Sequence, residues 1–406
     1  MAALNNTTFD AALKIQYRQG IEHAALEKST FLGVVEKRVS PGLQYNMVLD
    51  IEHTGASPSF VAAQSRAAAA TKRVFAVTRA KCYVFGSMSS ETLDAGANGG
   101  AVADPFADYM EEKLTEAAHA MSYSVWQGQG GAVGKISTVV TTRITLTNVE
   151  DHVHFNVGDF LEFSTTNDSA STPHSSGATA KITAIDRVNG FLDTGTNWAT
   201  QVSAIAASDF IFKEGWTGQN TAGVLAWVPP DTTPPVLFGL TRTTDNVRLA
   251  GYPLDVSSLD PISALLTAKG KFWVNAKVQP DITWMNPTEF TQLEIALEGK
   301  TVPTRVQGST LSGIKIGYDA ISYGGMSIMQ DVFCPVGYAL MTRKSGVWKL
   351  AHTRSGLFHF HDSDGNKLSR QANADADEFR IKSYYQMECH KPWCNVLLSY
   401  NSGGIT

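Results

Sequence analysis

The chain has 406 residues, of which 43% are hydrophobic and 17% are charged, with a formal net charge of −5 at pH 7. Its length corresponds to about two or three domains, and its charged fraction lies below the ~25% typical of soluble domains. The acidic balance excludes a protein that binds nucleic acid over its whole surface, although it leaves room for a local basic strip. No stretch is apolar enough to predict a membrane span.

The N-terminal residues predict an arm rather than a compact unit. The opening MAALNNTTFD has no basic segment followed by an apolar run, so we expect no secretory signal peptide. Between residues 8 and 38, apolar residues recur at helical intervals and are interrupted by Gly20 and Gly33. We therefore expect short helices within an arm that spans residues 1–42.

Residues 43–86 predict an extended β-hairpin. LQYNMVLDIEH and KRVFAVTRAKCYVFG are rich in valine, tyrosine and phenylalanine, and small, polar residues connect them. Because a lone two-stranded hairpin is marginally stable in water, this one should lie on another part of the subunit or on a neighbour. Five basic residues against Asp50 and Glu52 leave a net charge of +3. This basic strip serves either docking or the protection of solvated strand edges.

DPFADYMEEKLTEAAHAMSYSVWQG, residues 104–128, predicts the clearest helix of the chain. Asp104 is expected to cap it and Pro105 to start it. Apolar residues recur every three or four positions, and Gly128 ends the pattern. At ~1.5 Å per residue such a helix is more than about 30 Å long, enough to organise its surroundings.

Residues 134–214 differ from the preceding segments in their pattern of apolar and polar residues. KISTVVTTRITLTN, FNVGDFLEFST, TAKITAIDRVNGFLDT and SDFIFKEG alternate apolar and polar residues around turns of the Asn-Val-Gly-Asp and Val-Asn-Gly type. We expect a compact all-β module, a small barrel inserted after the long helix. The glycine-rich segments at its entrance and exit should act as hinges.

PDITWMNPTEFTQLEIAL, residues 280–297, predicts a strand joined directly to a helix. Asn286 is expected to cap the helix, Pro287 to start it, and Glu289 to reach back to the amide of the cap. A similar capped helix is predicted at Asp260. The closing segment DEFRIKSYYQMECHKPWCNVLLSY alternates as two long strands around a turn.

One fragment, HFHDSDGNK, gathers possible metal ligands: His359, His361, Asp362 and Asp364. An Asp-Gly pair is also what a tight hairpin turn requires, and we favour the turn. A helix-flanked calcium loop counted from Asp362 would need a glutamate at its twelfth position, where Asn373 stands.

The chain shows no catalytic constellation. Nucleophile-elbow, phosphate-loop and His-Glu-x-x-His patterns are missing from the sequence. The cysteines have no zinc-site spacing and are predicted to be free buried thiols in a reducing compartment: Cys82, Cys334, Cys389 and Cys394. We therefore expect no catalytic, cofactor or metal site, and a structural role rather than an enzyme.

The order of these elements resembles the major capsid proteins of tailed bacteriophages, whose fold also occurs in the capsid floor of herpesviruses. PDITWMNPTEFTQLEIAL is similar to the strand and helix of that family's axial domain, and AGYPLDVSSLDPISAL to the transition into it. GIKIGYDAISYGGMSIMQDVFCPVGYALM and FRIKSYYQMECHKPWCNVLLSY are similar to later strands of the family. The resemblance covers the chain apart from the module at 134–214.

The resemblance implies an α+β fold with the following parts: an N-terminal arm (1–42), an extended hairpin (43–86), a peripheral domain (87–133, 215–254 and 376–406) with its spine helix (104–128), the inserted module (134–214) and an axial domain (255–375). It also implies that hexamers and pentamers of the chain form an icosahedral shell around double-stranded DNA. Assembly would take place in the host cytoplasm, and the mature location would be the virion.

The implied partners are other copies of the chain, a portal protein, a separate scaffolding protein, a decoration protein and weakly, non-specifically bound DNA. No membrane and no cofactor are implied. The hairpin would reach over a neighbouring subunit, with these candidates for intersubunit contacts: Phe60, Arg66, Lys72, Arg73, Arg79 and Lys81. Some relatives weld subunits through a lysine at the hairpin tip. Residues 53–71 contain none, so we predict no such weld, and the weaker contacts permit procapsid maturation.

Two other interpretations stay open. A glycan-acting hydrolase with a β accessory module would need two suitably separated carboxylates, for which Asp159 and Glu162 are candidates. A phage tail or baseplate component would carry the β module on a different assembly.

Overall fold

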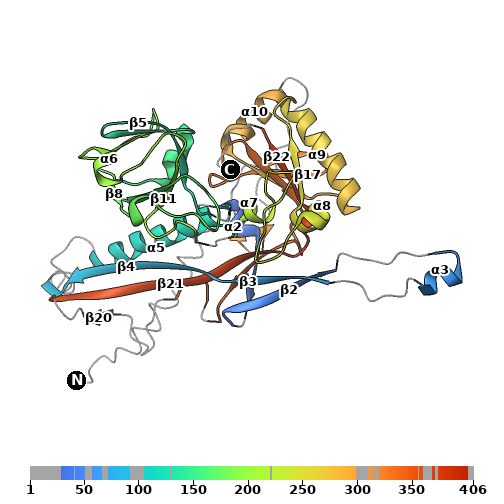
Figure 1. Cartoon of the computed structure of the whole chain (residues 1–406), viewed down its shortest axis with the longest axis horizontal. Helices are drawn as coiled ribbons and strands as arrows, with labels where there is room; N and C mark the ends of the chain where they lie inside the picture. The colour runs from blue at the N-terminus through green and yellow to red at the C-terminus, as the bar shows by residue number, and fades with distance from the viewer. Residues whose placement is uncertain are drawn as a thin grey trace.

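The computed structural model describes residues 29–40, 42–50, 57–65, 72–91, 105–128, 130–219, 222–298, 310–311, 314–315, 320–354, 356–359, 368–370 and 374–400. Helices and strands are mixed, which confirms the expected α+β class. Figure 1 shows two bodies side by side above a long, flat ribbon of strands. One body contains β5 to β11, and the other contains the helices α9 and α10.

A five-stranded sheet forms the ribbon. Its strands are β1 (Glu36–Val39), β4 (Ala80–Ser89), β19 (Trp348–His352), β20 (Leu368–Arg370) and β21 (Ala376–Cys389). The helix α5 (Pro105–Ser124) buries Met110, Leu114 and Ala117 against Val84 and Phe379 of this sheet. The apolar spacing predicted from the sequence is therefore the face that fixes the helix on the ribbon.

The second body contains a six-stranded sheet in the order β12-β22-β18-β13-β17-β16. Its strands are β12 (Tyr252–Asp255), β13 (Ile282–Met285), β16 (Ala320–Tyr323), β17 (Met326–Gln330), β18 (Tyr338–Thr342) and β22 (Val396–Ser399). Two helices accompany the sheet: α9 (Pro261–Ala276) and α10 (Pro287–Glu298).

The strand-to-helix junction before α10 is built as a cap. Asn286 accepts a hydrogen bond from the amide of Thr288 at 3.0 Å and donates one to the carbonyl of Cys334 at 2.7 Å. Asp260 likewise accepts from the amide of Ser263 at the start of α9. Both predicted caps are confirmed. The predicted role of Glu289 was wrong, because its carboxylate accepts from the amide of Gly337, whose loop crosses the start of α10.

The module is a sheet that closes on itself in the order β8-β7-β11-β5-β6-β10-β9. Its strands are β5 (Gly134–Val140), β6 (Arg143–Leu146), β7 (Phe160–Ser164), β8 (Ala180–Lys181), β9 (Ala184–Asp186), β10 (Phe191–Asp193) and β11 (Phe210–Lys213). Only residues 182–183 separate β8 from β9. The amide of Ile182 donates to Asp159 on one side, and that of Thr183 donates to Asp193 on the other. Residues 180–186 thus connect the two ends of the sheet, with β8 paired to β7 and β9 paired to β10.

Short elements complete the described chain. The helices are α2 (Thr30–Val34), α3 (Phe60–Ser65), α6 (Trp198–Gln201), α7 (Val224–Trp227) and α8 (Asn246–Ala250), with 3-10 turns η1 (Val149–His154), η2 (His174–Ser176), η3 (Thr243–Asp245) and η4 (Pro392–Cys394). The remaining strands are β2 (Gln44–Asp50), β3 (Lys72–Thr78), β14 (Thr310–Leu311) and β15 (Ile314–Lys315).

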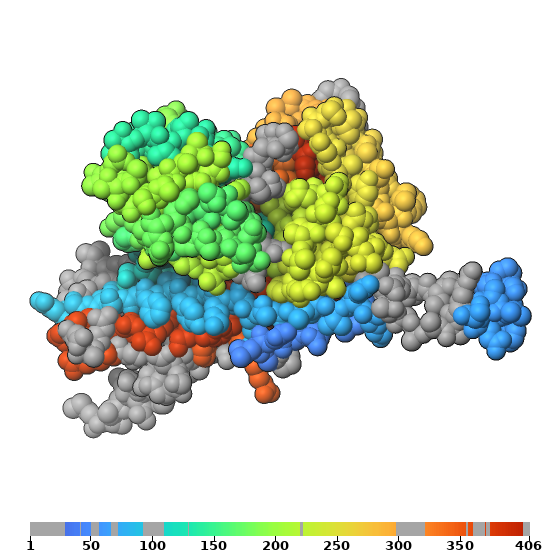
Figure 2. Space-filling view, viewed as in Figure 1, coloured from blue at the N-terminus to red at the C-terminus, as the bar shows by residue number. Residues whose placement is uncertain are grey.

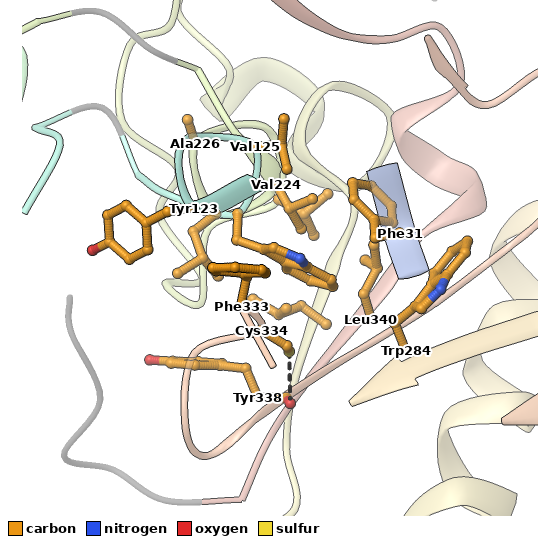
Figure 3. Close-up of a cluster of buried hydrophobic side chains, with 14 of the residues drawn as sticks. Phe31, Tyr123, Val125, Val224, Ala226, Trp284, Phe333, Cys334, Tyr338 and Leu340 are labelled. Carbon is orange, nitrogen blue, oxygen red and sulfur yellow. Dashed lines mark hydrogen bonds between the residues drawn. The ribbon is translucent and has the colours of Figure 1, made fainter. Parts of the chain in front are cut away.

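The core is organised around Phe31 of α2. Its ring centroid lies 4.8 Å from that of Trp126, 4.9 Å from that of Trp284 and 6.0 Å from that of Trp348. These tryptophans come from the end of the α5 segment, from the six-stranded sheet and from the five-stranded sheet. Figure 3 shows Phe31 and Trp284 within this buried cluster. One side chain therefore joins the helix and both sheets.

A buried carboxylate holds α2 in this position. Asp331 accepts hydrogen bonds from the amide of Phe31 at 2.8 Å, from the hydroxyl of Ser29 at 2.9 Å and from the amide of Phe333 at 2.9 Å. Burial raises the pKa of Asp331, while these hydrogen bonds act to lower it.

Three expectations about the backbone need correction. Residues 36–38, the end of the segment predicted as helical, belong to β1, which pairs in parallel with β19. The predicted return strand of the hairpin is two strands, because β3 pairs with β2 whereas β4 pairs with β21. The two closing strands belong to different sheets, since β22 joins β12 and β18. Each difference comes from a partner far away in the sequence.

Other predictions concern residues outside the described ranges, among them residues 1–28, Asp104 and residues 360–367. His359 pairs with Lys382 through backbone hydrogen bonds. The four cysteines are free and buried, as expected. Burial raises the pKa of the Cys82 thiol to about 12, which keeps it protonated and unreactive at neutral pH.

The substitution Phe31→Ala should destabilise the protein by about 3–5 kcal/mol, because it leaves a cavity among three tryptophans that cannot all close on it. Chemical denaturation followed by tryptophan fluorescence measures the change. Leu43→Ala is the matched control, since Leu43 is exposed on the next stretch of chain and should change stability little. Similar losses for the two variants would contradict the central role of Phe31.

Candidate subunit-contact surface

The hairpin of β2 and β3 has one face fixed to the body. The strands pair along their full length, from Gln44 opposite Thr78 to Asp50 opposite Lys72. The alternation of the strands buries one set of apolar side chains: Met47, Leu49, Phe75 and Val77. The ring centroid of Phe75 lies 5.0 Å from that of Trp227. The near part of the hairpin is thus anchored in the core.

Polar contacts secure the base of the hairpin. Gln386 donates to the carbonyl of Thr78 at 2.9 Å, and the guanidinium of Arg79 donates to the carbonyl of Ser40. Glu388 is buried, and its carboxylate accepts a hydrogen bond from Arg38 at 3.4 Å and lies 2.6 Å from His390. Burial acts to raise the pKa of Glu388, but the interactions with His390 and Arg38 outweigh it and lower the pKa.

The opposite face of the hairpin is exposed and partly apolar. Val48 and Val74 lie directly opposite one another on β2 and β3, and both are exposed. Lys72 is exposed at the end of the same face. A cross-strand valine pair normally gains stability by being covered. Here its side chains face away from the rest of the described chain.

The helix α3 stands clear of both bodies. None of its six residues is buried; Phe60 is 79% exposed and Val61 is 74% exposed. Ser59 caps it, accepting a hydrogen bond from the amide of Ala62. Figures 1 and 2 show α3 beyond the end of the hairpin, away from both bodies. A helix this short has little stability without packing, so its apolar residues require an external surface.

The ribbon offers a third exposed surface on β4. Lys81, Tyr83 and Phe85 alternate with buried residues and face away from α5. The ring of Tyr83 meets that of Tyr384 edge-on at 5.9 Å, and the guanidinium of Arg380 lies 5.7 Å from the centroid of Phe85. This face therefore mixes aromatic and basic side chains.

A fourth exposed surface lies on the helices of the second body. On α9, Leu266, Trp273 and Val274 are exposed, and Trp273 is 52% accessible. Ile295 of α10 is also exposed. Large apolar side chains on a surface helix mark a candidate contact with another molecule.

The sequence-predicted contact residues lie at different places on these surfaces. Phe60 is at the tip and Lys72 on the exposed hairpin face; Lys81 is on the ribbon, and Arg73 is half-buried on the anchored face. Arg79 is half-buried at the base, where it bonds within the chain. Arg66 lies outside the described residues. They are therefore not one cluster but positions spread along a single long projection.

Sequence reasoning missed several exposed apolar residues: Val48, Val61, Val74, Tyr83 and Phe85. Strand alternation could have identified four of them: Val48, Tyr83 and Phe85 lie between buried residues, and Val74 lies between half-buried Arg73 and buried Phe75. Ser59 before an alanine-rich run was also an available signal for α3.

The two candidate carboxylates of a hydrolase have structural contacts instead. Asp159 accepts from the amide of Asn156 and pairs with Lys213 at 3.3 Å. Glu162 accepts from the amide of Gly215 and the hydroxyl of Thr217. Among the residues that the structure describes, no group of three or more metal-ligating side chains lies together, and no helix is long and apolar enough to cross a membrane.

No protein-family model matches the chain, and no curated protein is similar to it in sequence. Solved structures that are similar to it include those of capsid and encapsulin proteins.

Three such structures illustrate the likeness. The capsid of cyanophage A-1(L) is similar with a TM-score of 0.49 and 11% identity, over 92% of this chain and 93% of that chain. The holo-SrpI encapsulin complex of Synechococcus elongatus gives a TM-score of 0.45 and 8% identity, over 91% and 86% of the two chains. The capsid of the native GTA particle gives 0.44 and 9%, over 93% and 90%.

The substitution Gly86→Ala should destabilise the ribbon by about 1–3 kcal/mol. A Cβ at residue 86 of β4 would come within 2.2 Å of the ring of Phe379 on β21, so the paired strands must shift. Thermal unfolding measures the loss, which the second substitution Phe379→Leu should partly reverse. Gly270→Ala is the control, because nothing lies near that position on α9; an equal loss there would refute the steric explanation.

Proposed function

We propose that this chain is a structural protein that assembles with copies of itself into a capsid shell. The observation that carries the proposal is the projection formed by the hairpin and α3. Its base is anchored in the core, while Val48, Val74, Phe60 and Val61 are exposed. The hairpin and α3 require an apolar surface from another molecule, and a second copy supplies one at fixed geometry.

Within this proposal, the arm, hairpin, peripheral domain, inserted module and axial domain keep the boundaries expected from the sequence. The segment proposed as axial supplies α9, α10 and the strands β13, β16, β17 and β18 of the six-stranded sheet, whereas β22 and most of β12 come from the segments proposed as peripheral. Conversely, β19 and β20 of the five-stranded sheet come from the axial segment. The exposed faces of α9 and α10 provide a second contact, between axial domains around a symmetry axis. Two separate contacts per chain are what a closed shell needs.

The energetics favour many modest contacts. Apolar burial contributes about 25 cal/mol per Å², from which the cost of association must be subtracted. Because each contact is repeated around a closed shell, weak contacts are enough to hold the shell together. Weak contacts also allow misplaced subunits to dissociate during assembly and the shell to mature. Hexamers and pentamers around double-stranded DNA form the specific assembly that we propose, with portal, scaffolding and decoration proteins as partners. The virion is the proposed location.

Particle formation by the purified chain tests the proposal. We expect uniform, closed particles by electron microscopy and a single fast boundary in sedimentation velocity. Rings or tubes would support a tail or baseplate component instead. A stable monomer at every accessible concentration would overturn the proposal.

The double substitution Phe60→Glu with Val61→Glu should abolish assembly while leaving the fold intact. Both side chains are exposed in the isolated chain, so two charges there cost little until a partner must bury them. Sedimentation velocity measures assembly, and circular dichroism measures folding.

Val188→Glu is the matched control, since Val188 is 86% exposed on a turn of the module and should tolerate a charge. Normal particles from the double variant would show that α3 is not a subunit contact.

A further inference from the structure

The turn η1 is one of the places where the module contacts the rest of the protein; another is Asn167, which accepts a hydrogen bond from the amide of Ala132 at 3.2 Å. The ring centroid of His154 lies 4.0 Å from that of Tyr123 and 6.3 Å from that of His119, both on α5. It lies 6.3 Å from the centroid of Phe333, in the loop that follows β17. Figure 3 shows Tyr123 and Phe333 in this region. The module, the long helix and the second body thus converge on one imidazole.

Two buried polar groups in η1 have atoms without a partner. Among the described residues, neither Oδ2 of Asp151 nor Nδ1 of His154 has a hydrogen bond, although both side chains are buried. His154 borders a small pocket with His119, Tyr123, Lys213 and Trp216. Such atoms are costly to bury, and burying a charge there costs far more.

The groups around His154 do not compensate a positive charge on it. Its protonation is disfavoured by three basic groups that face it: His119, His152 and Lys213. Of the two acids in η1, only Asp151 is buried. Burial lowers the pKa of His154 well below its ordinary value, and these basic groups lower it further. Burial raises the pKa of Asp151 to about 8, and Glu150 adds to that rise. Glu150 also acts on Glu289 of α10, and Asp151 on Tyr123.

We propose that η1 is a proton-operated latch: the module (134–214) docks on α5 only with both Asp151 and His154 uncharged, and ionisation of either group releases it. This inference goes beyond the proposed function and does not depend on it. On release, η1 separates from Tyr123, His119 and Phe333. The barrel itself stays folded, because its ladder does not pass through η1.

The pH dependence follows from proton counting. An exposed aspartate titrates near 3.9, so docking takes up a proton between about pH 4 and 8 and weakens about tenfold per unit as pH rises. An exposed histidine titrates near 6.5, so docking releases a proton below about pH 6.5 and weakens about tenfold per unit as pH falls. The two effects cancel between about pH 4 and 6.5.

The native protein should therefore dock with constant strength from about pH 4 to 6.5. From about pH 6.5 to 8 the opening equilibrium should rise about 30-fold, as only Asp151 still opposes docking. Asp151→Asn should remove this alkaline release and uncover release on the acid side, about tenfold per unit below pH 6.5. His154→Gln should open progressively with rising pH over the whole range.

The short sequence of η1, VEDHVH, supplies matched controls, since Glu150 is exposed and His152 half-buried. Because burial is the main cause of both pKa shifts, Glu150→Gln and His152→Gln should keep both slopes of the native profile and move them only slightly along the pH axis. Amide hydrogen exchange of Asp151 and Phe155 measures opening once the intrinsic pH dependence of exchange is removed. Both amides bond within the module, in and just after η1, and such a short turn has little stability once its buried residues lose their packing on α5. The amides of Val133 and Ile136 report the integrity of the barrel.

The four variants and the native protein are compared from pH 4.5 to 8.5. Opposite slopes for Asp151→Asn and His154→Gln, with slow barrel exchange throughout, support the latch. Identical profiles for all five proteins overturn it. So does parallel exchange of η1 and barrel amides, which would assign the response to unfolding of the module. If either buried-site variant fails to fold, proton NMR titration of His154 in the native protein decides: a pKa at or above 6.5 overturns the proposal.

Discussion

The insertion of Phe31 between three tryptophans is the contact on which the rest of the fold depends. Trp126, Trp284 and Trp348 lie far apart in the sequence, and each belongs to a different structural layer. Aromatic side chains bury large areas and prefer tilted or edge-on arrangements, which the three pairs show. Asp331 fixes the backbone of the arm at this point. The residue that unites the layers therefore comes from α2, near the start of the described chain.

The same organisation explains why so much of the projecting chain is uncovered. The core takes the inner face of the hairpin, through Phe75 and Trp227, and the face of α5 that lies on the ribbon. Val48, Val74 and the whole of α3 are left outside. Exposed apolar side chains therefore lie on the projection, the outer ribbon face and the exposed helix faces of the second body. The module also carries some, among them Val140, Val157 and Val188.

The parts of the fold that could be predicted are those that neighbouring residues determine. Periodic apolar residues indicated α5, and Asn286-Pro287 and Asp260-Pro261 marked helix starts through local capping. The alternation within residues 134–214 corresponds to strands β5 to β11.

What could not be predicted depends on distant partners. Glu36–Val39 is a strand only because β19, some three hundred residues later, offers an edge. Glu289 does not cap α10, because its carboxylate instead accepts a hydrogen bond from the amide of Gly337 in a distant loop. Likewise, the sequence indicated a projecting hairpin and named Phe60, but which hairpin side chains face outward depends on the anchoring of Phe75. Local periodicity determines elements, whereas exposure is decided by packing.

The most direct measurement compares amide hydrogen exchange of residues 57–65 in assembled particles and in dilute, dissociated subunits. If sister molecules order the projection, exchange in the particle should be slower by about 100-fold or more, while the amides around Phe31 stay protected in both states. Equal exchange in the two states, or a compact subunit whose tip is already protected when alone, would contradict the account.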